Sequence, residues 1–127
     1  MRLMKKCFLR VEPLEDRCLL SADFVFQWND LVLDVQRLRN QGNPPAARAM
    51  AMMNVAVYDS VNAIDPTHTV YHVDARAFPD VSTASADAAA AQAAHDVAVA
   101  LYTQPGEVAR FDTLLATQLG DVTAAQA

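Results

Sequence analysis

The spacing of apolar side chains predicts a helical protein from its first structured stretch onward. In "DFVFQWNDLVLDVQRLRNQGN" large apolar residues recur at intervals of three and four, the period of one face of an α-helix. They are Trp28, Leu31, Val35 and Leu38. Polar side chains take most of the other face, and Gly42 is a natural stop signal. The pattern predicts a first helix over residues 27–40.

The next stretch, "NPPAARAMAMMNVAVYDSVNAIDP", predicts a second helix. Two prolines open it, which suits a first helical turn, and Asn43 before them is the expected N-cap. Asp65 should end it, because a residue before proline is pushed out of the α region. The helix is apolar on nearly every side, so we expect it to be buried within a helical assembly.

A membrane span is the alternative for this second helix. Its longest run without charge, residues 49–58, is ten residues, and a span needs about 20. Arg48 and Asp59 would each cost a few kcal/mol within a bilayer. The buried helix is therefore the better interpretation, and Asn54, Tyr58 and Asn62 would then need hydrogen-bond partners.

Residues 65–81 lose the helical pattern. Prolines and β-branched residues there predict an extended connection on the surface. An alanine-rich third helix follows and reaches about Tyr102, since alanine has the highest helix propensity. Its expected N-cap is one of Ser82, Thr83 and Ser85.

A fourth helix is predicted over "EVARFDTLLATQLG", with Gly120 as its end. Its apolar face comprises Phe111, Leu114, Leu115 and Leu119. The remaining "DVTAAQA" has the pattern of a further helix start, with Asp121 or Thr123 as its N-cap. We interpret a chain that stops there as truncated.

These elements predict an all-α fold of about four helices, a partial helical bundle spanning residues 23–127. Composition agrees, because 53% hydrophobic and 20% charged residues are typical of a globular chain, and 127 residues suit one domain. The net charge of −5 is unevenly distributed, with no lysine after Lys6. The body therefore lacks a basic patch, which argues against a nucleic-acid partner.

The segment "MRLMKKCFLRVEPLEDRCLLSA", residues 1–22, begins like a signal peptide. Charged residues interrupt the apolar core of about 7–15 residues that a signal peptide needs, so composition predicts a disordered tail. Cys7 and Cys18 both lie in this segment. They could pair, but two cysteines make no disulfide framework, and we interpret them as free thiols.

Part of this segment, "VEPLEDRCLLSA", resembles an N-terminal motif of many planctomycete proteins thought to be exported. The resemblance spans residues 11–22. It implies that residues 1–22 are a sorting leader and that the protein is secreted or held at the cell surface. It implies nothing about chemistry.

A second resemblance covers residues 26–127. Its blocks are "PPAARAMAMMNVAVYDSVNAIDP", then Tyr71, then "AAAAQAAHDVAVALY" and "FDTLLATQL". Their order and spacing resemble the N-terminal helical region of the vanadium-dependent haloperoxidase family, within the type 2 phosphatidic acid phosphatase superfamily. Each block alone is an alanine-rich helix, so the specificity lies in their succession.

In that family this region is scaffold, and the resemblance implies that chemistry lies downstream. There a lysine, arginines and histidines hold vanadate or phosphate, in Arg-Pro, Pro-Ser-Gly-His and Ser-Arg blocks that this chain lacks. We therefore expect no catalytic, cofactor-binding or metal-binding residue here, and vanadate only in the complete family domain. The complete protein would oxidise halide with peroxide or hydrolyse a phosphate ester.

Several side chains could imitate a site. His68, His72 and Asp74 resemble a metal cluster in spacing, but a non-helical connection does not place them on one face. His95 and Asp96 are expected to be a polar pair at a helix edge.

Three further charges in or at the end of the second helix, Arg48, Asp59 and Asp65, could also imitate a site. Asp59 and Asp65 lie too far apart along a helix to act as a carboxylate pair, about 9 Å by rise alone. We expect Arg48 to pair with an acid of a neighbouring helix, such as Asp34, rather than to bind an anion.

Two hypotheses for function remain. In the first, the chain is the N-terminal scaffold of a haloperoxidase-like or phosphatase-like protein, inactive alone. It would expose an apolar helix surface that packs against the C-terminal helical half or self-associates. In the second, it is a short secreted helical interaction module without catalytic activity, complete at Ala127, monodisperse and cooperative in unfolding.

Overall fold

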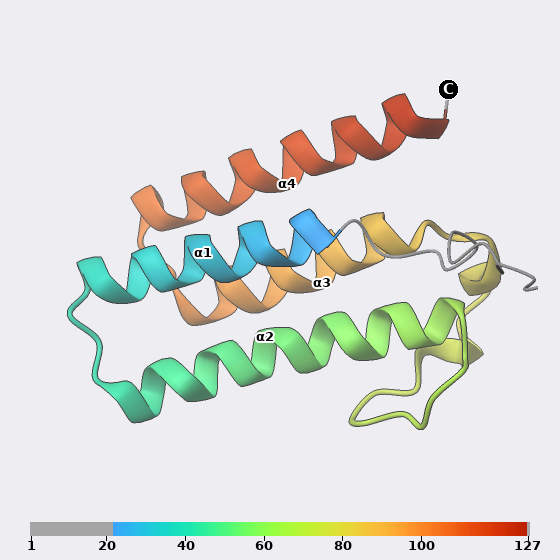
Figure 1. The fold of residues 1–127 in the computed structure, drawn as a ribbon, viewed down its shortest axis with the longest axis horizontal. Helices are drawn as coiled ribbons and strands as arrows, with labels where there is room; N and C mark the ends of the chain where they lie inside the picture. Colours follow the sequence, from blue (N-terminus) through green and yellow to red (C-terminus); the bar gives the residue numbers. More distant parts are fainter. Residues whose placement is uncertain (1–21, 127) are drawn as a thin grey trace, which may run out of the picture.

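The computed structural model describes residues 22–126, most of which are helical (Figure 1). The helices are α1 (Ala22–Leu38), α2 (Asn43–Ile64), α3 (Ala86–Leu101) and α4 (Pro105–Gln126). Two short 3₁₀ turns, η2 (Ala75–Ala77) and η3 (Val81–Thr83), interrupt the connection between α2 and α3. The predicted all-α class is confirmed, while the connection is less extended than predicted.

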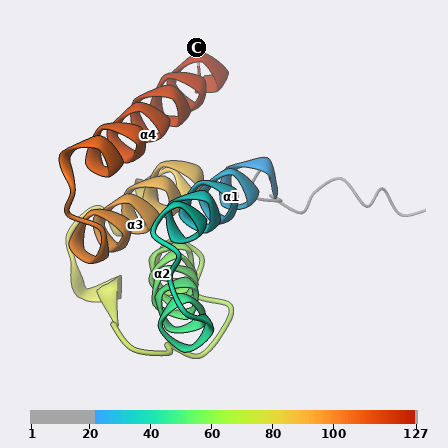
Figure 2. The same ribbon diagram turned by 90° about the vertical axis from the view of Figure 1, so that its left-hand side faces the viewer.

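The helices form layers. Turning the molecule shows α1 and α3 side by side in the middle, with α4 on one side of them and α2 on the other (Figures 1 and 2). α3 contacts each of the other three helices, whereas α2 and α4 do not touch. α3 is therefore the central element, and one side of α2 faces away from the assembly.

α1 differs from the predicted range of 27–40 at both ends. It begins at Ala22, where Asp23 in the first turn complements the positive end of the helix dipole. It ends before Asn40, whose φ of 49° is left-handed. Asn40 N donates to Arg37 O, and Gln41 N donates to Gln36 O. This is the Schellman pattern, with asparagine in the position that glycine usually takes, so Gly42 is not the stop signal.

α2 has the predicted bounds, with both prolines in its first turn and Asp65 as its C-cap. The predicted N-cap is wrong, because Gly42 precedes the helix and no side chain caps it. Within this chain α2 is buried on one side only, as the first hypothesis expects of a scaffold that exposes an apolar surface of this helix. Met53 and Val57 are buried, but Met52 and Tyr58 are exposed, because α4 does not reach this helix. None of the described helices has the length and apolar character to cross a membrane.

The ends of α3 and α4 test the remaining boundaries. Ser85 is the cap of α3, with its Oγ accepting from Ala88 N at 3.3 Å, and Tyr102 is the C-cap. The predicted end of α4 at Gly120 is wrong, since the helix continues to Gln126. A single glycine costs about 1 kcal/mol in a helix, and the alanines that follow favour continuing it. Asp121 and Thr123 are thus helical residues rather than N-caps.

Alanines of α3 line the centre of the core. They are Ala90, Ala91, Ala94 and Ala98, none more than 2% exposed. Three aromatic rings fill the space around these alanines: Trp28 of α1, Tyr102 at the end of α3 and Phe111 of α4. The ring of Phe111 stacks on that of Trp28 at a centroid distance of 6.3 Å. Small residues on α3 thus allow three helices to approach it closely.

Buried amides connect the layers through hydrogen bonds. Trp28 Nε1 donates to Gln118 Oε1 at 2.7 Å, and Gln118 Nε2 donates to Phe24 O at 3.2 Å. At the other end, Gln36 Nε2 donates to the Tyr102 hydroxyl at 3.0 Å. Buried polar groups are costly unless paired, so these bonds favour one alignment of α1 with α3 and α4.

His95 of α3 joins the same layers nearer the surface. Its Nε2 lies 2.7 Å from Asp112 Oδ1 on α4, and its Nδ1 lies 3.2 Å from Asp96 Oδ1. Its ring meets Trp28 edge-on at 6.2 Å. Burial alone lowers the pKa of His95, but the hydrogen bonds to Asp112 and Asp96 outweigh it and leave the pKa raised. The predicted polar pair at a helix edge is therefore an interhelical link.

Replacing Gln118 with leucine should lower the free energy of unfolding by about 1–3 kcal/mol, because it leaves Trp28 Nε1–H buried without a partner and removes the side-chain hydrogen bond to Phe24 O. Urea unfolding followed by circular dichroism measures the change. Thr117→Ala is the matched control on the exposed side of α4, expected to stay within about 0.5 kcal/mol. Equal effects of the two substitutions would contradict the role of Gln118.

His95 should make stability depend on pH. A pKa raised in the folded state gives stabilisation that is full below the unfolded value of about 6.5 and is lost as pH rises through the folded value. His95→Gln should therefore destabilise more at about pH 5.5 than at about pH 8.5. Urea unfolding at both pH values measures this, and Asp112→Asn should reduce the difference. A pH-independent effect would refute the ionic link.

Candidate functional site

The C-terminal half of α2 holds the connection that follows it. Tyr58 Oη donates to Thr69 O at 2.8 Å. Asn62 Nδ2 donates to His68 O at 2.9 Å, and His68 N donates back to Asn62 Oδ1 at 3.0 Å. Side chains of α2 therefore supply hydrogen-bond partners to the backbone of the connection, which has no helix or sheet to supply them.

The predicted need of the α2 polar residues for hydrogen-bond partners is thus confirmed. Tyr58 and Asn62 find theirs in the connection. Asn54 donates to Asn29 Oδ1 of α1 at 3.1 Å and to Met50 O at 2.9 Å.

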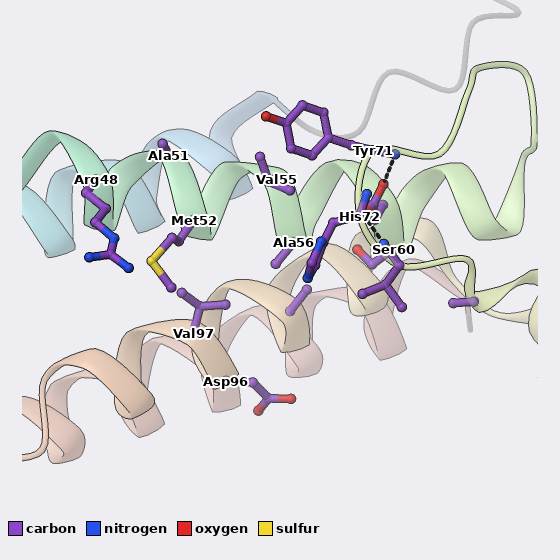
Figure 3. A pocket seen from close by; sticks show the side chains of 14 residues that line it. Arg48, Ala51, Met52, Val55, Ala56, Ser60, Tyr71, His72, Asp96 and Val97 are labelled. Carbon is purple, nitrogen blue, oxygen red and sulfur yellow. Dashed lines mark hydrogen bonds between the residues drawn. The ribbon is translucent and has the colours of Figure 1, made fainter.

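Asp59 is the strongest of these anchors. Its carboxylate accepts hydrogen bonds from the backbone N–H groups of Tyr71, His72 and Val73, each at 2.8 Å (Figure 3). Burial alone would raise the pKa of Asp59, but the N–H groups of Val73, Tyr71 and His72 together lower it. The carboxylate therefore stays ionised at neutral pH and fixes residues 71–73 against α2.

With the connection fixed, α2, α3 and residues 71–75 enclose a groove of about 650 Å³, hereafter the α2–α3 groove (Figure 3). Its floor is apolar and comprises Ala51, Met52, Val55, Ala56, Ala93 and Val97. Tyr71, Val73 and Ala75 form the wall from the connection. Its polar lining residues are Arg48, Asp59, Ser60, His72 and Asp96. A groove of this size and character suits an apolar partner.

Arg48 lies at one end of the groove (Figure 3). Within residues 22–126 it forms no ion pair, so the predicted pairing with Asp34 is wrong. Asp34 pairs instead with Arg37 at 3.4 Å and with Arg110 of α4 at 3.3 Å. The acid of α1 is thus engaged by its own helix and by α4, while Arg48 is on the exposed side of α2.

The histidines and acids of the connection do not gather into a site. Asp74 pairs with Arg76 at 2.6 Å, and the side-chain hydrogen bond from Arg76 lowers the pKa of Asp74 to about 2. His68 Nδ1 lies 2.7 Å from Thr67 Oγ1. Residues 22–126 hold no group of three or more His, Cys, Asp and Glu side chains that could bind a metal ion. Cys7 and Cys18 lie outside the described residues.

The groove residues also do not fit an oxyanion such as vanadate. Such a ligand needs several converging cations or free N–H donors. The groove offers one arginine, Arg48, and one histidine, His72, against two carboxylates, Asp59 and Asp96. The nearby backbone N–H groups already donate to Asp59.

Residues 12–124 match the family model of the vanadium chloroperoxidase N-terminal domain. The chain belongs to this family. No curated protein and no solved structure matches it. The match confirms the haloperoxidase part of the resemblance in the sequence. It leaves the superfamily placement and the export motif as predictions, and residues 1–21 lie outside the described part of the chain.

In this vanadium chloroperoxidase N-terminal domain, Asp59 and the groove are what sequence reasoning missed. The sequence indicates Asp59 as a charge that disfavours a membrane span and as a possible partner of Asp65, yet a carboxylate in an otherwise apolar helix is itself a signal that N–H donors must meet it. The groove has no such signal, because it depends on how the connection folds back.

Asp59→Asn should weaken the anchor by on the order of 2–3 kcal/mol, since an amide replaces a charged acceptor of three N–H bonds. Limited trypsin proteolysis after Arg76 should become faster. Because the pKa of Asp59 is lowered, the wild-type advantage in free energy of unfolding should be present above about pH 4 and lost as pH falls through the folded value, which urea unfolding measures where trypsin is inactive. The exposed Asp30→Asn is the control and should leave cleavage unchanged.

Proposed function

We propose that this chain is the N-terminal scaffold of a vanadium-dependent haloperoxidase-like protein and carries no vanadate site of its own. The observation that carries the proposal is the family match over residues 12–124, combined with a groove that is apolar where an oxyanion site would be cationic. The scaffold would supply a rigid helical platform, and the vanadate-binding part of the enzyme would supply the chemistry.

For the complete enzyme we propose peroxide-dependent halide oxidation. The family description names chloroperoxidase, which supports this reaction over phosphate ester hydrolysis. Bound vanadate would supply the activation of peroxide in that part of the enzyme. The residues of this chain would act by packing, since the lining of the groove does not suit an oxyanion.

We further propose delivery outside the cell. The support is the motif "VEPLEDRCLLSA" at residues 11–22, which resembles the leader of exported proteins. Fusing residues 1–22 to a fluorescent reporter in a planctomycete host tests this. Export of the fusion, and retention when residues 11–22 are scrambled, is the expected result.

Vanadate titration tests the scaffold assignment. The purified chain should show no saturable vanadate binding by ⁵¹V nuclear magnetic resonance and no peroxide-dependent oxidation of chloride or bromide. Saturable binding with halide oxidation, lost in Arg48→Ala, would overturn the proposal.

A separately purified vanadate-binding domain of a vanadium chloroperoxidase, competent to bind vanadate, should associate with the chain. If the chain is monodisperse and does not bind this domain, the result would favour the alternative function, a secreted interaction module.

A further inference from the structure

We propose that the α2–α3 groove is the docking surface for one amphipathic helix of the vanadate-binding part of the enzyme, and that this helix carries a carboxylate facing Arg48. The inference rests on the proposed scaffold function and specifies the surface and the chemistry of its partner. Four observations carry it: exposed apolar area, shape, charge and rigidity.

Three of the exposed large apolar side chains lie together in the groove. Met52, Tyr71 and Val73 line it and are 42%, 74% and 52% exposed. They come from two separate parts of the chain, yet they line the same groove. An apolar surface that two elements build jointly is typical of an interaction site rather than of isolated surface residues.

The shape of the floor suits a helix. Arg48, Met52, Ala56 and Ser60 form one row at four-residue spacing on α2, and Ala51, Val55 and Asp59 form the next. A furrow between two such rows receives the ridge of a second helix crossing at about −50°. From Arg48 to Ser60 the furrow is about 18 Å long, which is three to four turns.

The charges of the groove determine which residues the incoming helix must present to it. Arg48 at one end has no acid partner within the described range, and burying it under an apolar helix would be costly without a counter-charge. The accessible acid of the groove, Asp96, already accepts from Gln92 Nε2 at 2.8 Å and contacts His95. The incoming helix therefore needs a carboxylate at the Arg48 end and no second acid near Asp96.

The same charges argue against a second copy of this chain as the occupant. A two-fold interface places the same surface on both sides, so each Arg48 would need an acid from the partner groove. Asp59 is buried and used by three backbone N–H groups, and Asp96 is engaged by its own helix. Self-association would therefore leave each Arg48 only the partner's Asp96, whose Oδ1 already contacts Gln92 and His95, whereas a helix with its own carboxylate needs no such sharing.

The groove is already formed in the free chain. Asp59 holds the wall at residues 71–73, and Tyr58 and Asn62 hold the preceding residues. Docking therefore needs little ordering of the backbone, which favours affinity.

The experiment measures association of the 127-residue chain with the vanadate-binding domain of a vanadium chloroperoxidase, purified separately and confirmed competent to bind vanadate. Isothermal titration calorimetry gives the affinity, and displacement of an apolar fluorescent dye reports groove occupancy. Met52→Asp and Arg48→Glu should each weaken binding by about tenfold or more, while Arg48→Lys should stay within about threefold. Leu38→Asp and Arg37→Glu are matched controls at exposed positions of α1 and should bind like wild type.

The outcomes separate this inference from the proposed function. Binding that is lost only in the groove variants supports it. Binding that persists in the groove variants contradicts the groove as the docking surface but leaves the scaffold function intact. If neither the wild-type chain nor any variant associates with the domain, both the docking surface and the scaffold function are contradicted. Concentration-dependent dimerisation that Met52→Asp abolishes overturns it in favour of a second copy. Circular dichroism checks each variant, and Val73→Ser on the connection replaces Met52→Asp if that variant unfolds.

Discussion

The close approach of three helices to α3 is the constraint on which this fold depends. The inner face of α3 consists of alanines, so α1, α2 and α4 can pack near its backbone, and the aromatic rings of α1 and α4 fill the space between them. A larger side chain at Ala91 or Ala94, both fully buried, would overpack the centre. The same packing leaves α2 attached through one face only, which is why its other face is open.

Specificity within this apolar core comes from a few buried polar bonds. Alanine and valine surfaces slide easily past one another, since apolar contact has no direction. The Trp28–Gln118 bond and the Gln36–Tyr102 bond lie at opposite ends of α1. Each would be broken if α1 shifted along its neighbours by one residue. Two fixed ends therefore define the position of the helix more sharply than the apolar contacts between them.

Local sequence signals predicted the elements well but not their surroundings. Helix periods, the paired prolines and Ser85 are local, and the structure confirms what they predicted. The predicted end of α1 was wrong because an asparagine adopts the left-handed conformation expected of glycine. The predicted end of α4 was wrong because one glycine does not stop a helix. The predictions for Arg48 and Asp59 failed for another reason. The backbone donors that meet Asp59, and the absence of an acid beside Arg48 among residues 22–126, depend on how the connection and α4 are placed, which no local pattern contains.

The way Asp59 holds the groove wall has a consequence for how the family can diverge. The three hydrogen bonds that the carboxylate accepts all come from the main chain at residues 71–73, and of their side chains only His72 adds a small electrostatic contribution. Tyr71, His72 and Val73 can therefore be exchanged for other residues while the backbone of the wall keeps its course. Selection could retune which helix the groove accepts by changing these three positions, without disturbing the packing of α1 to α4.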